Sequence, residues 1–410
     1  MTVRAKMIAA MLIGCNCLGL VACSKPGSDQ ETAKRQSLAD SEETGCITPI
    51  RTEAVDAPEK HAWDLFLAVV YPAKDPKVAR GEPDCTKPLG APGTTSVWET
   101  WRLARTEVFL EDGSEPPAWD DMSLPSGYLG TTPDSGLKPG ERPGPTKKSF
   151  DPDLNQSIFV DHGGIGETRM NKATYAFIKE NCLWSFDGLS RYSKAVVDEK
   201  KSPINFPVDS QEVKAVWIEF TPDDLKAGRE KTYYHVVHAG KTYGMTSFHI
   251  LTKDTPNWFW ATFHHRETPE NPDEVKSKFP IPDRAKNTVW ANYVLGGTQS
   301  DFVTPIGSPT VLSDYYIEYK FTKSSCITCH ASAHGHPEPG RGPDGKLSRD
   351  SEGDIAAASE GPLQTLDLGA PNAGAFIKNG KPYFIQTDFL WSIPFRAREE
   401  KSAPPKRCLF

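Results

Sequence analysis

The sequence predicts an α+β fold with a helical N-terminal part, a central antiparallel β-sheet and long loops around a Cys-x-x-Cys-His motif late in the chain. Two amphipathic helical patterns lie before residue 110, and four strand patterns follow between residues 213 and 265. The connections between these strands are short, which indicates antiparallel pairing. The chain has 32 glycines and 35 prolines among 410 residues, which indicates a loop-rich surface.

Residues 1–22 have the pattern of an export signal, with Arg4 and Lys6 before an apolar run that is too short to span a membrane. The run ends in Leu-Val-Ala-Cys, which resembles a bacterial lipobox and predicts lipidation of Cys23. Ser24 in the next position favours the outer membrane by the sorting rule for lipoproteins. The alternative is an ordinary secretory signal that is cut nearby. In both cases we expect the chain to work in the periplasm, on the inner side of the outer membrane where the lipobox is used.

After the signal, the composition divides the chain into parts. Residues 23–48 are polar and charged, as expected of a flexible tether. A helical, loop-rich part spans 49–200, and a part with the sheet and the Cys-x-x-Cys-His motif spans 201–410; the two form either one continuous domain or two. The formal net charge of −7 disfavours nucleic acid as a partner. No later stretch is long and apolar enough to cross a bilayer, so we expect membrane contact through the lipid anchor alone.

The motif Cys326-Ile-Thr-Cys329-His330 is the attachment pattern of a c-type haem. Both sulfurs lie on one side of a single turn, where they can form thioethers with the two vinyl groups. The adjacent imidazole then serves as the proximal axial ligand of the iron. A disulfide or half of a zinc site is the alternative, because both share the Cys-x-x-Cys spacing. Export favours one covalent haem, and Ser325 is a candidate N-cap for the helix that carries it.

The other cysteines are informative as well. Once those of the signal, the lipid anchor and the haem motif are set aside, Cys46, Cys85, Cys182 and Cys408 remain. An even number in an oxidising compartment predicts two disulfides with three alternative connectivities. Pairing of Cys46 with Cys85 is the first to consider, because it would fasten the first helix. The alternative is four free buried thiols.

Helices are expected in the N-terminal half. A capping pattern at Asp56 and Glu59 opens the first, whose apolar positions recur with helical spacing. Ser96 and Glu99 form a second capping box in front of an amphipathic stripe that reaches residue 108. A third, short helix is expected over 171–180.

The strands follow as β-branched and aromatic runs. They are expected over residues 213–220, 233–239, 243–251 and 258–265, with a last strand over 383–395. If the third of these alternates regularly, Met245 and His249 lie on one face of it.

The distal axial ligand is expected to come from this sheet or to be water. No methionine follows Met245, so the ligand cannot be a downstream methionine as in many small cytochromes c. His334 and His336 lie directly behind His330 and should stay on the proximal side or in solvent. We expect His249 first, because imidazole is a strong ligand for both oxidation states, and Met245 next. Further candidates are His264, His265 and Met170.

Several segments of the sequence show a resemblance. Residues 61–72, 97–101, 248–253 and 258–263, together with Ser325 to Ala331, resemble a family of bacterial exported cytochrome c proteins of similar length that have a single Cys-x-x-Cys-His motif. The resemblance covers most of the chain after the tether. It implies covalent haem at Cys326, Cys329 and His330, but no particular reaction. One departure is His264, at a position where the family leads us to expect an acidic residue.

Three classes of function fit these features. The first is electron transfer between periplasmic partners, in which the protein adjusts the potential of the haem. The second is a haem enzyme with an open distal site, loosely similar to the cytochrome P460 type that oxidises small nitrogen compounds. The third is a protein whose haem senses a gas. A low-spin, six-coordinate iron would favour the first.

Overall fold

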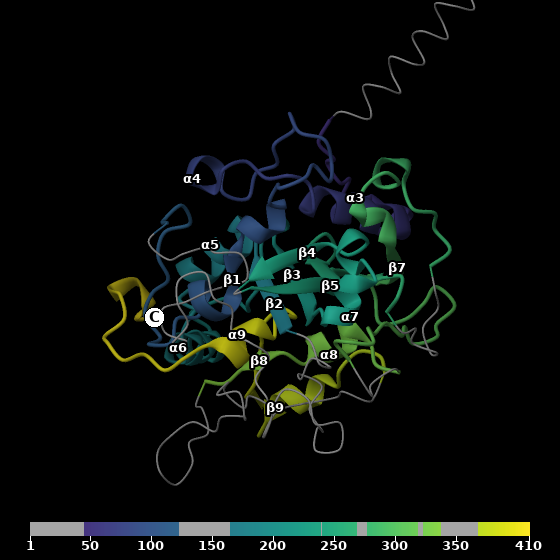
Figure 1. Cartoon of the computed structure of the whole chain (residues 1–410). Coiled ribbons are helices and arrows are strands. Elements are labelled where there is room, and N and C mark those ends of the chain that lie inside the picture. The colour runs from purple at the N-terminus through teal and green to yellow at the C-terminus, as the bar shows by residue number, and fades with distance from the viewer. Residues whose placement is uncertain (1–44, 123–164, 239, 269–276, 319–322, 338–367) are drawn as a thin grey trace, which may run out of the picture. The chain divides into compact units, whose positions relative to one another are not determined.

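The fold is built around a seven-stranded antiparallel sheet, which confirms the α+β class (Figure 1). The computed structural model describes residues 45–122, 165–238, 240–268, 277–318, 323–337 and 368–410, which belong to one compact unit. The strand order is β1-β2-β3-β5-β6-β7, and β4 pairs with the first part of β5. The bounds are β1 (Arg102–Leu103), β2 (Ile165–Met170), β3 (Gln211–Glu219), β4 (His235–His238), β5 (Lys241–Thr252), β6 (Phe259–His265) and β7 (Tyr293–Gln299).

The four strands expected between residues 213 and 265 are confirmed as β3, β4, β5 and β6, and consecutive ones among β4, β5 and β6 share ladder bonds. Sequence patterns did not predict β1, β2 and β7. β2 precedes residue 200 and pairs with β3 from Ile165 opposite Trp217 to Met170 opposite Glu212. The sheet therefore joins the two parts into which composition divides the chain.

β5 contains a bulge that decides which of its side chains share a face. Val216 on β3 lies opposite Ser247, but its neighbour Trp217 lies opposite Met245, so Thr246 is an extra residue on β5. An extra residue shifts the phase of the alternation by one. The side chains of Met245 and Ser247 therefore lie on opposite faces of the sheet.

One face of the sheet, here called the α3 face, carries Phe248 and Phe263. It is covered by α3 (Pro58–Val69). The ring of Phe66 stacks on Phe263 with centroids 4.3 Å apart and meets Phe248 edge to face at 5.8 Å, while Trp63 meets Phe263 at 5.0 Å. Trp63 and Phe66 are among the apolar positions with helical spacing that predicted this helix. Each buried side chain of this size contributes about 1.5–3 kcal/mol to stability.

The opposite face, here called the α8 face, is covered by C-terminal segments that include α8 (Cys326–Ala331) and α9 (Ser392–Arg396). Ser392 donates to the buried Glu212 of β3 at 2.6 Å, and the ring of Trp260 on β6 meets that of His330 at 4.6 Å. Figure 1 shows the sheet between α3 and these two helices. The haem motif is thus held against the sheet rather than on a separate lobe.

Two further helices precede β3. α5 (Lys172–Glu180) begins after Asn171, whose side chain accepts from Thr174 N at 3.0 Å, as its sequence pattern predicts. α6 (Phe186–Val197) was not predicted; Ser185 caps it by accepting from Gly188 N.

Both disulfides that the cysteine count predicts are present. Cys46 pairs with Cys85, the pairing considered first, with Cα atoms 5.1 Å apart. Cys182 pairs with Cys408, with Cα atoms 5.7 Å apart. The second one ties the last turn of the chain to the segment between α5 and α6.

The first two helical patterns are only partly confirmed. α3 begins after Ala57 with no side-chain cap, and Asp56 instead ends the separate turn α2 (Glu53–Asp56), so the predicted cap at Asp56 is wrong. The capping box at Ser96 and Glu99 is confirmed, but it opens only a 3-10 turn, η1 (Val97–Thr100). The chain then forms β1 and the π-helical turn η2 (Ala104–Val108), because pairing with β2 interrupts the expected helix.

The strand expected over residues 383–395 is wrong. Only β11 (Ile385–Gln386) is extended, and α9 follows it. Asp388 and Phe389 have φ of +48° and +72°, which ends an extended strand.

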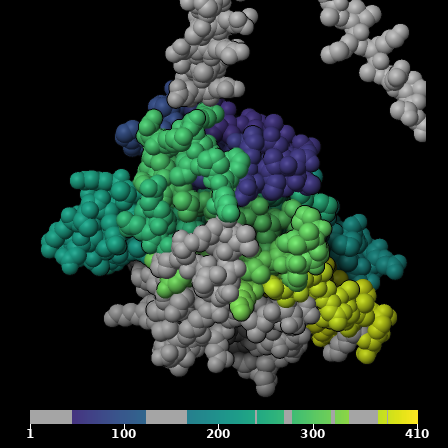
Figure 2. Space-filling model, turned by 90° about the vertical axis from the view of Figure 1, so that its right-hand side faces the viewer, coloured from purple at the N-terminus to yellow at the C-terminus, as the bar shows by residue number. Residues whose placement is uncertain are grey.

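The remaining elements are short, and the predicted segments at the N-terminus lie outside the described residues. The elements are α4 (Pro76–Ala79), α7 (Pro222–Lys226), η4 (Arg229–Lys231), η5 (Asp283–Ala285), η6 (Val289–Asn292), β8 (His334–Gly335), η7 (Ala373–Phe376), β9 (Ile377–Lys378), β10 (Lys381–Pro382) and η8 (Lys406–Cys408). Figure 2 shows the segment 277–318 in green beside the purple N-terminal helices, where Ser277 donates to Glu59 at 2.6 Å. Within the described ranges, no helix has the length and apolar character to cross a membrane. The export signal, Cys23 and the tether up to residue 44 lie outside these ranges.

A buried carboxyl, that of Glu99, lies on the α3 side of the sheet. Glu99 is 4% exposed and accepts hydrogen bonds from Ser96 N at 2.8 Å and from the hydroxyl of Tyr234. Burial raises the pKa of Glu99 to about 7, and the charge of Glu167 acts in the same direction. Arg169, which pairs with Glu167 at 2.6 Å, opposes this increase in the pKa of Glu99.

Candidate functional site

The Cys-x-x-Cys-His motif forms the short helix α8, which is fixed to the end of β7. Ser325 is its N-cap, as predicted, and its hydroxyl accepts from Thr328 N at 3.4 Å. Gln299, the last residue of β7, donates to the same hydroxyl at 3.0 Å and accepts from Ile327 N at 3.2 Å. Thr328 donates in turn to Gly369 O at 2.9 Å. The helix is held at both its start and its middle.

The two cysteines of the motif are thiols outside any disulfide, unlike the four in the two disulfides. Cys326 is 7% exposed, and its Sγ donates to Leu312 O at 3.2 Å. Cys329 is more open, yet burial raises its pKa to about 12, helped by the charge of Glu318. Residues three apart share one side of a helix, so both sulfurs can reach one flat group. Cys326 and Cys329 do not form the disulfide that was the alternative for this motif.

A zinc site does not match the surroundings either. Across the ranges that the structure describes, no three side chains of His, Cys, Asp or Glu are gathered as metal ligands. A structural zinc site normally takes four such ligands. The donor set at the motif, two thiols and one imidazole on one turn, fits a haem better.

His330 is oriented by a hydrogen bond at its other ring nitrogen. Its Nδ1–H donates to the carbonyl oxygen of Phe389 at 2.7 Å, which leaves Nε2 as the nitrogen that can bind a metal. Desolvation lowers the pKa of His330 to about 4, although the Phe389 carbonyl opposes this. The ring is therefore neutral at pH 7, the form that coordinates iron. A carbonyl partner at Nδ1 also makes Nε2 a stronger donor.

His249 lies on the α8 face of the sheet, the face against which His330 packs. It is opposite Lys214 on β3 and Thr262 on β6 and is 8% exposed. Its Nε2 is buried and has no hydrogen-bond partner among the described residues. Burial keeps its pKa well below the usual value, and the charges of Lys214, His330 and His264 act in the same direction. A buried unpaired nitrogen costs about 1–3 kcal/mol, so it needs a reason.

The sheet register brings His249 near His330. Trp260, which contacts His330, lies opposite Leu251, and Thr262 lies opposite His249. Trp260 and His249 are therefore diagonal neighbours on adjacent strands, a relation that spans about 7–8 Å. The charge of His330 also lowers the pKa of His249, which agrees with both imidazoles lying on the same part of the α8 face.

The structure removes most of the other candidates for the distal ligand. Met245 is opposite Trp217 and fully buried on the α3 face, so the expectation that it shares a face with His249 is wrong because of the bulge at Thr246. His265 also faces away and stacks on Tyr233 with ring centroids 3.4 Å apart. His264, opposite Ser247, does lie on the α8 face.

One candidate, Met170, lies outside β5 and β6, and the two histidines that were expected behind His330 also lie away from β5 and β6. Met170 ends β2 and is opposite Glu212, and two strands, β3 and β5, separate β2 from β6. His334 is buried against Phe384 and Trp391, behind α8 as expected. His336 packs against the ring of Tyr383 at 4.2 Å.

Sequence patterns did not reveal Asp314, which contacts Ser247 on the α8 face of the sheet. Its carboxyl is 3% exposed and accepts from Ser247 Oγ at 2.6 Å and from Tyr316 N at 2.8 Å. Burial raises the pKa of Asp314, while the charge of His264 lowers it. Nothing around Asp314 in the sequence marks it, because its neighbours come from β5 and β6.

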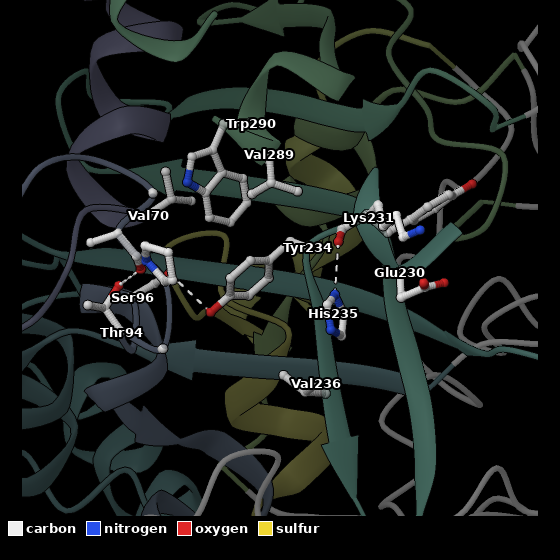
Figure 3. A pocket seen from close by; sticks show the side chains of 15 residues that line it. Val70, Thr94, Ser96, Glu230, Lys231, Tyr234, His235, Val236, Val289 and Trp290 are labelled. Carbon is white, nitrogen blue, oxygen red and sulfur yellow. Dashed lines mark hydrogen bonds between the residues drawn. The ribbon is translucent and has the colours of Figure 1, made fainter. Parts of the chain in front are cut away.

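A separate cavity of about 420 Å³ opens beside β4 and η6 (Figure 3). Trp290 and Tyr234 line it, with ring centroids 4.5 Å apart, and Val70 at the end of α3 lies across from them. Trp290 also meets Phe66 at 5.5 Å, so this cavity is on the α3 side of the sheet. It is therefore on the opposite side of the sheet from His249 and His330.

No protein-family model, curated protein or solved structure matches the chain. The function of the site therefore has to be inferred from its own residues and geometry.

Proposed function

We propose that the chain is an exported c-type cytochrome of the single-motif kind that its sequence resembles, with one covalent haem. Cys326 and Cys329 would hold the haem and His330 Nε2 would bind its iron. The observation that carries the proposal is the pair of neutral imidazoles on the α8 face. One has its Nδ1 engaged by Phe389 O, and the other, His249, has a buried Nε2 with no partner among the described residues.

Electron transfer is the activity that this arrangement supports best. A bound haem supplies one-electron redox chemistry. His249 would act as the distal ligand, and two imidazole ligands suit both oxidation states of the iron. The surrounding sheet is rigid, so the ligands move little when the charge of the centre changes. A periplasmic redox protein would be the partner, and lipidation at Cys23 would keep the chain at the outer membrane.

A haem enzyme or gas sensor with an open distal site is the second candidate. It is favoured by the buried Asp314, whose raised pKa makes its carboxyl a candidate proton donor. Asp314 contacts Ser247, which lies two residues before His249 on β5 and on the same face of the sheet. Acids held this way can donate a proton to a bound small molecule.

The first test asks for covalent haem. Haem staining after denaturing electrophoresis should keep the colour on the polypeptide, and the Cys326→Ala/Cys329→Ala variant should lose it. Colour that leaves the wild-type chain under denaturation contradicts the proposal.

Absorption and electron paramagnetic resonance spectra then separate the two candidates. Low-spin iron in the wild type that becomes high-spin in His249→Ala supports electron transfer with His249 as ligand. His334→Ala is the matched control and should leave the spectrum unchanged, because its ring packs behind α8. A high-spin wild type that responds to cyanide or nitric oxide would favour the open site instead.

The anchor is tested separately. Labelled palmitate should enter the wild-type protein, and Cys23→Ser should abolish the label and release soluble protein. If the wild type carries no label and Cys23→Ser stays on the membrane, the lipobox interpretation is wrong.

A further inference from the structure

The turn between β11 and α9 has an uncommon backbone. Asp388 and Phe389 are consecutive non-glycine residues with φ of +48° and +72°. L-residues avoid this region because Cβ crowds the backbone, and a bulky side chain such as Phe is rarely found there. Leu390 N donates to Thr387 O at 3.2 Å across the turn. A conformation of this kind persists only where its surroundings hold it.

A buried ion pair holds this turn. Lys253, directly after β5, donates to Asp388 Oδ1 at 2.6 Å, and the two side chains are 7% and 8% exposed. The second carboxylate oxygen of Asp388 accepts from Phe206 N at 2.7 Å. Lys253 also donates to Pro256 O at 3.0 Å and lies over the ring of Trp258. The carboxylate is thus fixed from two sides, and the backbone of Asp388 is fixed with it.

The turn presents the carbonyl that orients His330. Phe389 O accepts from His330 Nδ1–H at 2.7 Å, and the ring of Phe389 lies 6.2 Å from that of Trp260, which itself contacts His330. A small change of φ at residue 388 or 389 would swing this carbonyl away. The orientation of the imidazole therefore depends on the backbone of a strained turn.

We propose that Lys253 and Asp388 are positioning residues that set the reduction potential of the haem through this turn. The inference rests on the proposed function, since it requires iron at His330. A strong hydrogen bond at Nδ1 increases electron donation from Nε2 and stabilises the oxidised iron. When the ion pair is removed, the turn relaxes, the hydrogen bond weakens and the midpoint potential rises.

The test compares two double variants of the haem-loaded protein that differ by one Cβ atom. Lys253→Met/Asp388→Ala removes the ion pair but still requires an L-residue with positive φ at position 388. Lys253→Met/Asp388→Gly removes the same pair, yet glycine adopts that φ without strain. Both have the net charge of the wild type, so a difference between them is not electrostatic. The readouts are the midpoint potential and the solvent exchange rate of His330 Nδ1–H in the reduced protein.

We expect the Ala variant to have a higher potential and faster exchange than the wild type, and the Gly variant to remain close to the wild type. The control is Lys241→Met/Glu219→Leu, which removes an exposed ion pair of 2.8 Å at the other end of β5 and should change neither readout. If the Ala variant does not fold, Lys253→Met/Asp388→Asn replaces it, and its potential should be higher than that of the Gly variant.

The remaining outcomes overturn the inference. Equal shifts in the Ala (or Asn) and Gly variants, or no shift in either, mean that the turn does not set the potential, while the haem assignment stands. A wild-type chain without covalent haem overturns the proposed function, and this inference with it.

Discussion

Removal of the disulfide between Cys182 and Cys408 should destabilise the protein more than removal of the one between Cys46 and Cys85. The bonds close loops of different length, with sequence separations of 226 and 39 residues. The loops do not overlap, so the two effects should add. Loop closure in the unfolded chain then predicts losses of about 5.4 and about 3.9 kcal/mol, a difference of about 1.5 kcal/mol.

Packing acts in the same direction. Cys182 and Cys408 are both fully buried, whereas Cys46 is only partly buried, so cavity formation adds to the cost at the longer loop. The assay is urea unfolding of the Cys182→Ala/Cys408→Ala and Cys46→Ala/Cys85→Ala variants under non-reducing conditions, followed by tryptophan fluorescence. Thiol titration should confirm that each variant keeps its other disulfide. If the variant without the shorter loop loses as much stability or more, the loop-closure reasoning is wrong for this protein.

Three other substitutions test the packing and the buried charge. Phe66→Ala should lower the free energy of unfolding by about 3–5 kcal/mol, because the ring is fully buried among aromatic side chains, while Val78→Ala, at a side chain that is 82% exposed, should change it by less than about 0.5 kcal/mol in urea titrations. The folded-state pKa of Glu99, about 7, lies above its usual value of 4.5, so its stabilising effect is complete below pH 4.5 and disappears as the pH rises through 7. Glu99→Gln should therefore reduce the fall in stability over this window, by at most about 1.4 kcal/mol per pH unit, and an unchanged pH profile would refute the raised pKa. Gly188→Ala should destabilise α6, because an added Cβ would lie 2.0 Å from the backbone oxygen of Cys182; a melting temperature equal to that of the wild type would show that this helix end can move.

Local sequence patterns predicted the elements in which the spacing of the apolar residues agrees with the tertiary packing. The apolar spacing in α3, the position of α5, the cap of α8 and the four central strands all depend on residues close in sequence. β1 was predicted wrongly, because Arg102 and Leu103 lie within an amphipathic helical pattern but pair with β2 in the sheet. Propensity is a weak prior where tertiary pairing competes with it.

The proximal half of the site was predictable and the distal half only in part. The spacing of Cys326, Cys329 and His330 encodes their geometry directly. His249 could be placed on a strand, but its neighbours depend on a bulge at Thr246 that no residue pattern announces. Asp314 could not be found at all, since it reaches the site from a segment 67 residues after Ser247.

The burial of Cys326 has a consequence for how the protein matures. In the folded chain its sulfur is almost covered and donates to Leu312 O, while Gln299 holds the neighbouring backbone of α8. If the chain carries the covalent haem proposed above, a separate protein that joins haem to this sulfur could not reach it there. Thioether formation would therefore have to come before β7 and residue 312 pack against the motif. Under that proposal, folding of this region would have to wait for haem delivery, and a shortage of haem would leave a chain in which α8 is not yet packed against β7 and is exposed to proteases.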